Sequence, residues 1–195
     1  MVGAAIRKSG VPRSEIFVTT KLWNTEHEPH DVEKALVNSL ANLGLDYVDL
    51  FLIHFPCAFA PGEALIPRDG DGSIKVSKTS YIDTWKAMEK TLATGKTKAI
   101  GISNFSRAEV EDILRQGNIV PAVHQLECHP WLQQTNFTEW QKSLGIHITQ
   151  YSPFGNQNPI YNSSSPAKLM VCSALVLVNY NLTMLNPWTG RPDLG

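Results

Sequence analysis

Residues 49–54 have the sequence Asp-Leu-Phe-Leu-Ile-His, an almost wholly apolar run that ends in a histidine. A run of this length and composition predicts a strand buried on both faces, as in a parallel sheet covered by helices. The same pattern, an apolar stretch closed by a polar side chain, recurs at residues 17–21, 99–104, 122–127 and 147–152. Helix-period segments separate these runs, so the sequence predicts an α/β fold.

The segments between the runs carry helix start and stop signals. The apolar repeat that begins near Pro29 ends at Gly44, where a C-terminal cap is expected. Ser80 and Ser106 each stand three residues before an acidic side chain, which is typical of a capping box. Residues 56–79, rich in Pro, Gly and Asp, form a connection long enough to predict a functional rim loop.

Regular alternation of strand and helix leaves two architectures, the closed eight-stranded barrel and the open doubly wound sheet. No Gly-x-Gly-x-x-Gly follows any predicted strand, which disfavours a dinucleotide site of the Rossmann kind. Polar residues at the ends of all the predicted strands favour the barrel, because barrel enzymes work at the C-terminal strand ends. A full barrel has eight strands and about 250 residues. We therefore expect an incomplete (β/α)8 TIM barrel with five recognisable strands.

The strand–helix rhythm stops after Gly155. We expect residues 1–158 to form the partial barrel and residues 159–195 to be a tail that is disordered or pairs with a sheet edge. Residues 171–178 have strand-like composition and are the candidate for that edge pairing.

Composition and charge exclude several classes of partner. The chain is 43% hydrophobic and 18% charged, as in ordinary globular domains. A net charge of -1 gives no electrostatic reason to expect nucleic acid or a membrane surface as partner. The longest apolar stretch, residues 169–178, is about half of the ~20 residues that a spanning helix needs. The three cysteines form no spaced pairs, so we predict a soluble protein of the reducing cytoplasm.

Lys21 and His54 close two of the predicted strands and would lie at the mouth of a barrel. A surface lysine that merely caps a strand and a structural histidine are the alternatives. Partial burial would lower both pKa values and leave a neutral imidazole able to donate a hydrogen bond to a substrate oxygen.

Three further strand ends carry groups that suit a planar carboxamide ligand. Ser103 and Asn104 supply a hydroxyl and an amide, and Gln125 is an amide within an otherwise apolar strand. Tyr151 offers an aromatic face for stacking. The alternatives stay open: Ser103 and Asn104 as the start of a turn, Gln125 as a link to the next strand, and Tyr151 as a core aromatic residue.

A metal site is not predicted. Residues 127–129 read Glu-Cys-His, but neighbouring strand residues point to opposite faces and no ligand pair has zinc spacing. Cys57 likewise lacks the surroundings of a nucleophile.

Five co-linear motifs resemble those of the aldo-keto reductases. They are Val-Thr-Thr-Lys-Leu-Trp (18–23), Leu-Asp-Tyr-Val-Asp-Leu-Phe-Leu-Ile-His-Phe-Pro (45–56), Gly-Ile-Ser-Asn-Phe (101–105), Gln-Leu-Glu-Cys-His-Pro (125–130) and Tyr-Ser-Pro (151–153). The resemblance covers residues 2–158, and the second motif is most similar to the fungal and yeast aldehyde, glycerol and xylose reductases.

The resemblance implies a barrel that transfers a hydride from NADPH, with NADH as the alternative, to a small-molecule aldehyde or ketone. It assigns catalytic roles to Lys21 and His54. It also assigns cofactor-binding positions, which are Ser103, Asn104, Gln125, Tyr151 and Ser152. Two aromatic residues, Trp23 and Phe55, take the positions that line the substrate pocket.

The family's general-acid Tyr and its Asp partner lie upstream of the lysine, and neither residue type occurs before Lys21. Nothing after residue 160 matches the family's eighth strand and basic cofactor segment. We therefore expect a product truncated at both ends, with Met1 an internal methionine and catalysis impaired. The alternative is a non-catalytic isoform that binds a partner chain, or itself, through open barrel edges; a relocated acid at Tyr161 or Tyr180 is less favoured.

Overall fold

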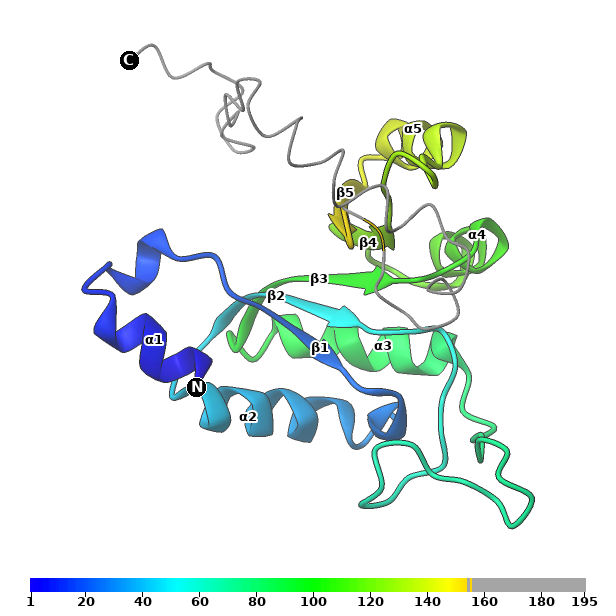
Figure 1. Cartoon of the computed structure of the whole chain (residues 1–195), viewed down its shortest axis with the longest axis horizontal. Helices are drawn as coiled ribbons and strands as arrows, with labels where there is room; N and C mark the ends of the chain where they lie inside the picture. The colour runs from blue at the N-terminus through cyan, green and yellow to red at the C-terminus, as the bar shows by residue number, and fades with distance from the viewer. Residues whose placement is uncertain (154, 156–195) are drawn as a thin grey trace. The chain divides into compact units, whose positions relative to one another are not determined.

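The computed structural model describes residues 1–153 and 155. Its strands form one sheet in chain order, β1 (Thr19–Leu22), β2 (Val48–Ile53), β3 (Thr97–Ser103), β4 (Val123–Glu127) and β5 (His147–Tyr151). The helices between and before them are α1 (Val2–Lys8), α2 (Val32–Leu43), α3 (Tyr81–Leu92), α4 (Arg107–Gln116) and α5 (Thr135–Ser143), with short 3-10 turns at Arg13–Glu15 and Asn24–Glu26 (Figure 1). β1 to β4 pair in parallel, which confirms the predicted arrangement of an incomplete (β/α)8 barrel.

The chain divides into two compact units. The first comprises Met1–Leu126 and Gln134–Thr149, and the second comprises Glu127–Gln133 with the chain from Gln150 onward. The division at residue 158 stays a prediction. The tail at 159–195, the candidate edge segment at 171–178, and Tyr161 and Tyr180 lie outside the described residues.

The core of the first unit lies between the strands and the helices that follow them. Every residue of β2 is buried, as its apolar sequence predicts. α2 contacts β1, α3 contacts β3, and the two helices contact each other. Trp85 and Met88 of α3 are fully buried in this core. Gly101 of β3 allows a close approach of β4, because an added Cβ would overlap the carbonyl of Val123 and lie 2.7 Å from Leu52 Cδ2.

The predicted helix caps are mostly confirmed. Gly44 ends α2 in the left-handed conformation, with φ of 65°. Ser106 and Glu109 form the reciprocal capping box at the start of α4. At α3 the Ser80 hydroxyl accepts from the Ile82 N–H, so the predicted cap is present with a different backbone partner.

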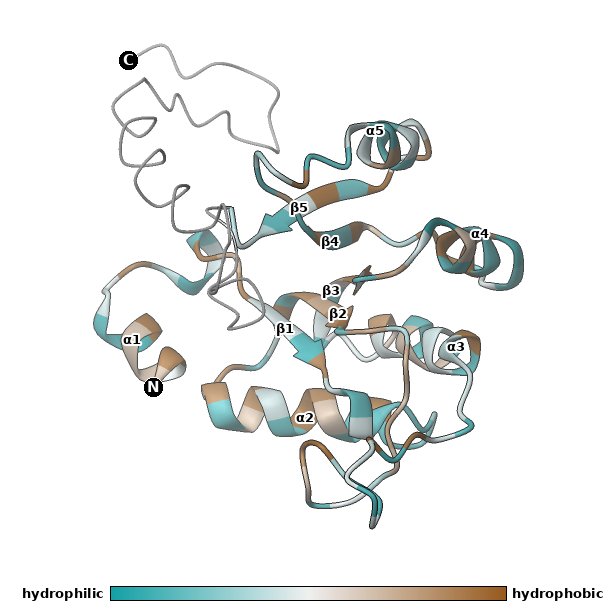
Figure 2. Ribbon diagram, turned by 45° about the vertical axis from the view of Figure 1, so that its right-hand side comes forward, coloured by the Kyte–Doolittle hydropathy of each residue, from teal (hydrophilic) through white to brown (hydrophobic). Residues whose placement is uncertain are grey.

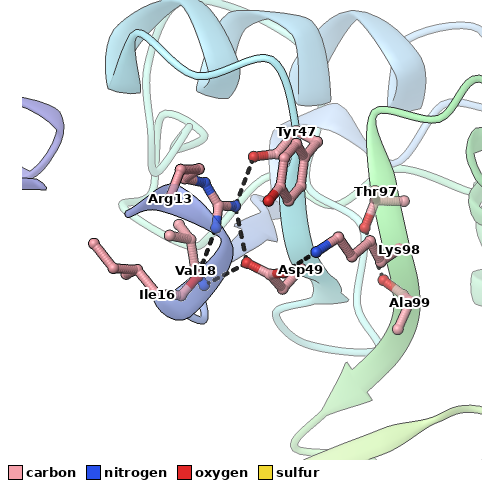
Figure 3. A network of polar contacts seen from close by, with 8 residues as sticks. All are labelled: Arg13, Ile16, Val18, Tyr47, Asp49, Thr97, Lys98 and Ala99. Atoms are coloured by element: carbon pink, nitrogen blue, oxygen red, sulfur yellow. Dashed lines mark hydrogen bonds and ion pairs between the residues drawn. The ribbon is translucent and has the colours of Figure 1, made fainter. Parts of the chain in front are cut away.

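Asp49 is the centre of a polar network near the start of β2 (Figure 3). Its carboxylate accepts from Val18 N at 2.9 Å, Arg13 Nη2 at 2.8 Å and Lys98 Nζ at 2.9 Å. Arg13 and Lys98 also lie over the ring of Tyr47, at 4.0 and 4.3 Å from its centroid. Burial alone raises the pKa of Asp49, but the three hydrogen bonds and the Arg13 charge outweigh it and lower that pKa. The network joins the segment before β1 to β2 and β3, at the end of the strands opposite to the predicted site.

Within residues 1–153 and 155, no helix is long and apolar enough to cross a membrane.

Candidate active site

The predicted catalytic and carboxamide-binding residues of the first unit gather at the C-terminal ends of neighbouring strands. Lys21 of β1 is in register with Leu52 of β2, and the His54 N–H donates to the carbonyl of Leu22 at 3.2 Å. Ser103 closes β3 in register with Gln125 of β4. In Figure 2 the ribbon of β1 becomes hydrophilic at its arrowhead, which is the strand end that carries the lysine. The parallel pairing therefore brings a cation, an imidazole, a hydroxyl and an amide to one edge of the sheet.

Lys21 and His54 influence each other's charge. Both are partly buried. Burial lowers the pKa of Lys21, while burial and then the Lys21 charge lower the pKa of His54. The imidazole is therefore neutral at pH 7, as the sequence predicts, and one of its nitrogens carries a hydrogen that it can donate.

Aromatic side chains surround His54. The His54 ring meets Trp23 edge-on, with ring centroids 5.2 Å apart, and stacks on Phe55 at 4.8 Å. Trp23 Nε1 donates to the carbonyl of Leu65 at 2.7 Å, which ties the long loop after β2 to the end of β1. The predicted pocket residues Trp23 and Phe55 thus contact His54, and the loop of residues 56–79 meets Trp23 at Leu65. Its role as a functional rim loop stays a prediction.

The loop after β3 links the carboxamide-binding candidates to one another. Ser103 Oγ donates to the Gln125 carbonyl at 2.9 Å, and the Asn104 N–H donates to the same oxygen at 3.1 Å. Asn104 Nδ2 donates to the His54 carbonyl at 2.9 Å and to Ser103 Oγ at 3.1 Å. Asn104 holds a positive φ of 64°, which asparagine tolerates better than most residues. Gln125 also donates from Nε2 to Thr149 Oγ1 at 3.3 Å, the link to the next strand that was one of its alternatives.

Tyr151 and Ser152 belong to the second unit. The Tyr151 carbonyl accepts from the Cys128 N–H at 3.4 Å, and Ser152 has a positive φ of 50°. Their assignment to cofactor binding stays a prediction.

The Glu-Cys-His run also lies in the second unit. His129 Nε2 lies 3.2 Å from Glu127 Oε1, and Cys128 Sγ contacts Gln150 Nε2 and the Gln133 carbonyl. Among the residues that the structure describes, no group of three His, Cys, Asp or Glu side chains could hold a metal ion.

The sequence reasoning missed His124, the neighbour of Gln125 in β4. His124 is fully buried and its Nε2 accepts from the Phe105 N–H at 3.0 Å, directly after Asn104. The available signal was an imidazole inside a predicted strand, beside Gln125, and strand alternation points the two side chains to opposite faces.

Comparison with known proteins identifies relatives of this chain. A model described as the aldo/keto reductase family matches residues 1–163. An uncharacterized oxidoreductase of Schizosaccharomyces pombe is 53% identical over 165 residues, which cover 85% of this chain and 51% of that protein. Aldo-keto reductase family 1 member A1 of Rattus norvegicus is 44% identical over 162 residues, 80% of this chain and 50% of its own length.

Solved structures give the same picture. The aldose reductase from Giardia lamblia matches with a TM-score of 0.76 and 36% identity, over 80% of this chain and 53% of its own. The aldose reductase from Schistosoma japonicum matches with a TM-score of 0.77 and 35% identity, over 90% of this chain and 58% of its own. The chain thus spans about half the length of the curated relatives that it matches.

Proposed function

The chain belongs to the aldo/keto reductase family, and from this we propose that its site reduces a small-molecule aldehyde or ketone to an alcohol with a nicotinamide cofactor. The observation that supports this most directly is the convergence of Lys21, His54 and the Ser103–Asn104–Gln125 set on one edge of the sheet. NADPH is the proposed cofactor, with NADH as the alternative, and when bound it would supply the hydride.

The residues present fit a carboxamide. Ser103, Asn104 and Gln125 bring one hydroxyl and two amides to neighbouring strand ends, which offers both donors and acceptors to a planar group. Gln125 Nε2 is held by one long bond to Thr149, at 3.3 Å, so exchanging that partner for a ligand oxygen costs little. We propose that Tyr151 stacks on the nicotinamide ring and that Ser152 adds a cofactor contact.

The chain's own residues would act on the substrate carbonyl through charge and orientation. A neutral His54 would donate a hydrogen bond to the carbonyl oxygen, and the Lys21 ammonium beside it would stabilise negative charge that develops there. Trp23 and Phe55 would form an apolar wall that excludes water and strengthens both interactions.

For the 195-residue chain by itself we propose weak catalysis. No ion pair of the described residues includes Lys21, and burial lowers its pKa. A positioned general acid contributes roughly 10² to 10⁴ in rate, and no tyrosine precedes Lys21 in this sequence. The reducing cytoplasm remains the predicted location, and this prediction rests only on the absence of spaced cysteine pairs in the sequence.

Titration of the chain with NADPH, followed by nicotinamide fluorescence, tests the proposal. We expect micromolar binding and about tenfold weaker binding by Gln125→Met, which keeps the side-chain length but removes the amide. Lys34→Met, an exposed change on α2, is the control. Lys21→Met is expected to bind NADPH and to lose aldehyde-dependent NADPH oxidation. A folded wild-type chain that shows no NADPH binding would contradict the proposal.

Association through the sheet edge is a second candidate function. Val18 and Leu22 direct their carbonyls to β2, so alternation points the backbone groups of Thr19 and Lys21 to the other side of β1. Exposed edge groups of this kind can pair with another strand. Light scattering of the wild-type chain and of Thr19→Pro, which removes one edge donor, is the test. A wild-type chain that stays monomeric at high concentration would argue against this candidate.

A further inference from the structure

A directed row of hydrogen bonds joins the loop after β3 to helix α5 through the interior. The Phe105 N–H donates to His124 Nε2 at 3.0 Å. His124 Nδ1 pairs with Gln141 Oε1, and Gln141 Nε2 donates to the Phe137 carbonyl at 3.3 Å. His124 and Gln141 are both fully buried, so water does not substitute for any of these partners.

The two ends of the row fix its direction. A backbone N–H can only donate, so His124 Nε2 must be the unprotonated ring nitrogen and Nδ1 must carry the hydrogen. A backbone carbonyl can only accept, so the Gln141 amide must turn Nε2 to Phe137 and Oε1 to His124. The two requirements agree at the bond between His124 and Gln141, where the Nδ1 hydrogen meets the Oε1 acceptor. Burial also lowers the pKa of His124 to about 4, against the Gln141 bond and the Glu109 charge, which keeps the ring neutral.

Two aromatic rings, those of Phe105 and Phe137, contact the imidazole of His124. His124 meets Phe105 edge-on at 6.3 Å and Phe137 edge-on at 5.8 Å between ring centroids. Phe105 is in turn 5.6 Å from Tyr81 of α3 and is 2% exposed. The ring of His124 therefore has little freedom to rotate away from the Phe105 N–H.

The anchored residue directly follows Asn104, whose left-handed backbone needs support from its surroundings. The Asn104 N–H is fixed by Gln125, and its side chain by His54 and Ser103. In the part of the chain that the structure describes, the next peptide N–H, that of Phe105, donates to His124 Nε2. Without that bond, the peptide between Asn104 and Phe105 could turn and carry the Asn104 side chain with it.

We propose that His124, oriented by Gln141, is a positioning residue that holds the peptide after Asn104 and so keeps the Ser103 and Asn104 side chains in place to receive a carboxamide. The carboxamide as ligand rests on the proposed function, whereas the hydrogen bond by which His124 holds the loop after β3 does not. His124 itself touches neither Ser103 nor Asn104 through its ring nitrogens; it acts through the backbone of Phe105.

The affinity for NADPH, measured in three variants and one control, shows how the hydrogen bonds of His124 affect ligand binding. His124→Leu removes the acceptor while keeping an apolar side chain of similar size, and we expect about tenfold weaker NADPH binding. His124→Gln offers Oε1 in place of Nε2 and is expected to bind within about threefold of wild type. Gln141→Met frees the imidazole and should fall between them. Ile113→Val, a fully buried change on α4 outside the row, lowers stability without altering binding.

Measurements on the chain without NADPH separate this inference from the proposed function. We expect the Phe105 amide hydrogen to exchange about tenfold faster in His124→Leu than in wild type, with His124→Gln protected and the amides of α3 unchanged. Nitrogen NMR of wild-type His124 should show the hydrogen on Nδ1.

Equal Phe105 exchange in all folded variants, or a hydrogen on Nε2, would overturn the inference whether or not NADPH binds. If His124→Leu does not fold, His124→Gln and Gln141→Met carry the same comparison of exchange. A wild-type chain that binds no NADPH yet shows the expected exchange and tautomer would remove the proposed cofactor and leave the positioning role of His124 supported.

Discussion

Replacement of Asp49 by alanine should remove a large share of the stability of the first unit. The buried Val18 N–H would lose the carboxylate that accepts its hydrogen bond, at a cost of about 1–3 kcal/mol. Arg13, whose side chain is 21% exposed, would lose a charged partner for about 1–2 kcal/mol. Lys98 is 55% exposed, so solvent screens its pair with Asp49 and the loss of that pair adds little. We expect a total of about 2–5 kcal/mol, against about 5–15 kcal/mol for a whole domain.

The dependence on pH follows from the direction of the Asp49 pKa. The folded pKa is lower than the ordinary value, so the carboxylate stabilises the fold fully above the unfolded pKa of about 4. That stabilisation is lost as pH falls through the lower folded pKa. The difference between wild type and Asp49→Ala should therefore be constant at neutral pH and shrink below about pH 4.

Urea unfolding followed by tryptophan fluorescence and circular dichroism measures both effects. Asp49→Asn keeps an acceptor for the Val18 N–H and should be intermediate, and Lys98→Met should change the free energy of unfolding little, because solvent screens that pair. Binding of NADPH should be unaffected, because the network lies at the opposite strand ends. The reasoning fails if Asp49→Ala unfolds within about 1 kcal/mol of wild type at pH 7, or if the difference persists unchanged in acid.

Other changes test the interior and the site. His27 and His124 are buried, and their pKa values are lowered to about 4, so both stay neutral in the folded chain while the unfolded chain takes up protons below about pH 6.5. The free energy of unfolding should therefore fall by up to about 3 kcal/mol for each histidine as pH decreases from about 6.5 to 4, and urea midpoints across that range measure it. Lys21→Met should raise the pKa of His54, because it removes the positive charge that lowers it; proton NMR titration would expose an error if the pKa fell or stayed constant. Gly101→Ala should destabilise the sheet by more than about 3 kcal/mol, since its Cβ meets the backbone of β4, and a soluble variant with wild-type melting behaviour would contradict this.

Much of the sheet could be predicted because its strands depend on local sequence. Each apolar run lies within two residues of the strand that forms, and the capping box of Ser106 and Glu109 needs only residues three positions apart. The adjacency of Lys21 and His54 followed from the rule that parallel strands end at one edge. Local signals and one topological rule were sufficient for these features.

The remaining features depend on contacts between distant segments. The hydrogen bond from Trp23 to the Leu65 carbonyl joins residues 42 positions apart, and no property of either residue's neighbours indicates it. The left-handed Asn104 is explained by three partners together: His54, which directly follows β2, Ser103 of β3 and Gln125 of β4. His124 gave a signal, an imidazole inside a predicted strand, but its partner Gln141 is fixed only by the packing of α5.

The division of roles between Lys21 and His54 follows from their intrinsic basicities. Lysine has an ordinary pKa of about 10.4 and histidine of about 6.5, so when two bases share a partly buried edge the lysine keeps the proton. The ammonium then opposes a second charge beside it, and burial acts in the same direction on the imidazole. The aromatic rings of Trp23 and Phe55 contact the imidazole without offering an anion that would stabilise its protonated form. At neutral pH the edge therefore carries one positive charge and one neutral hydrogen-bond donor. Both groups favour negative charge on an oxygen placed between them, and neither depends on where in the sequence a proton donor for that oxygen lies.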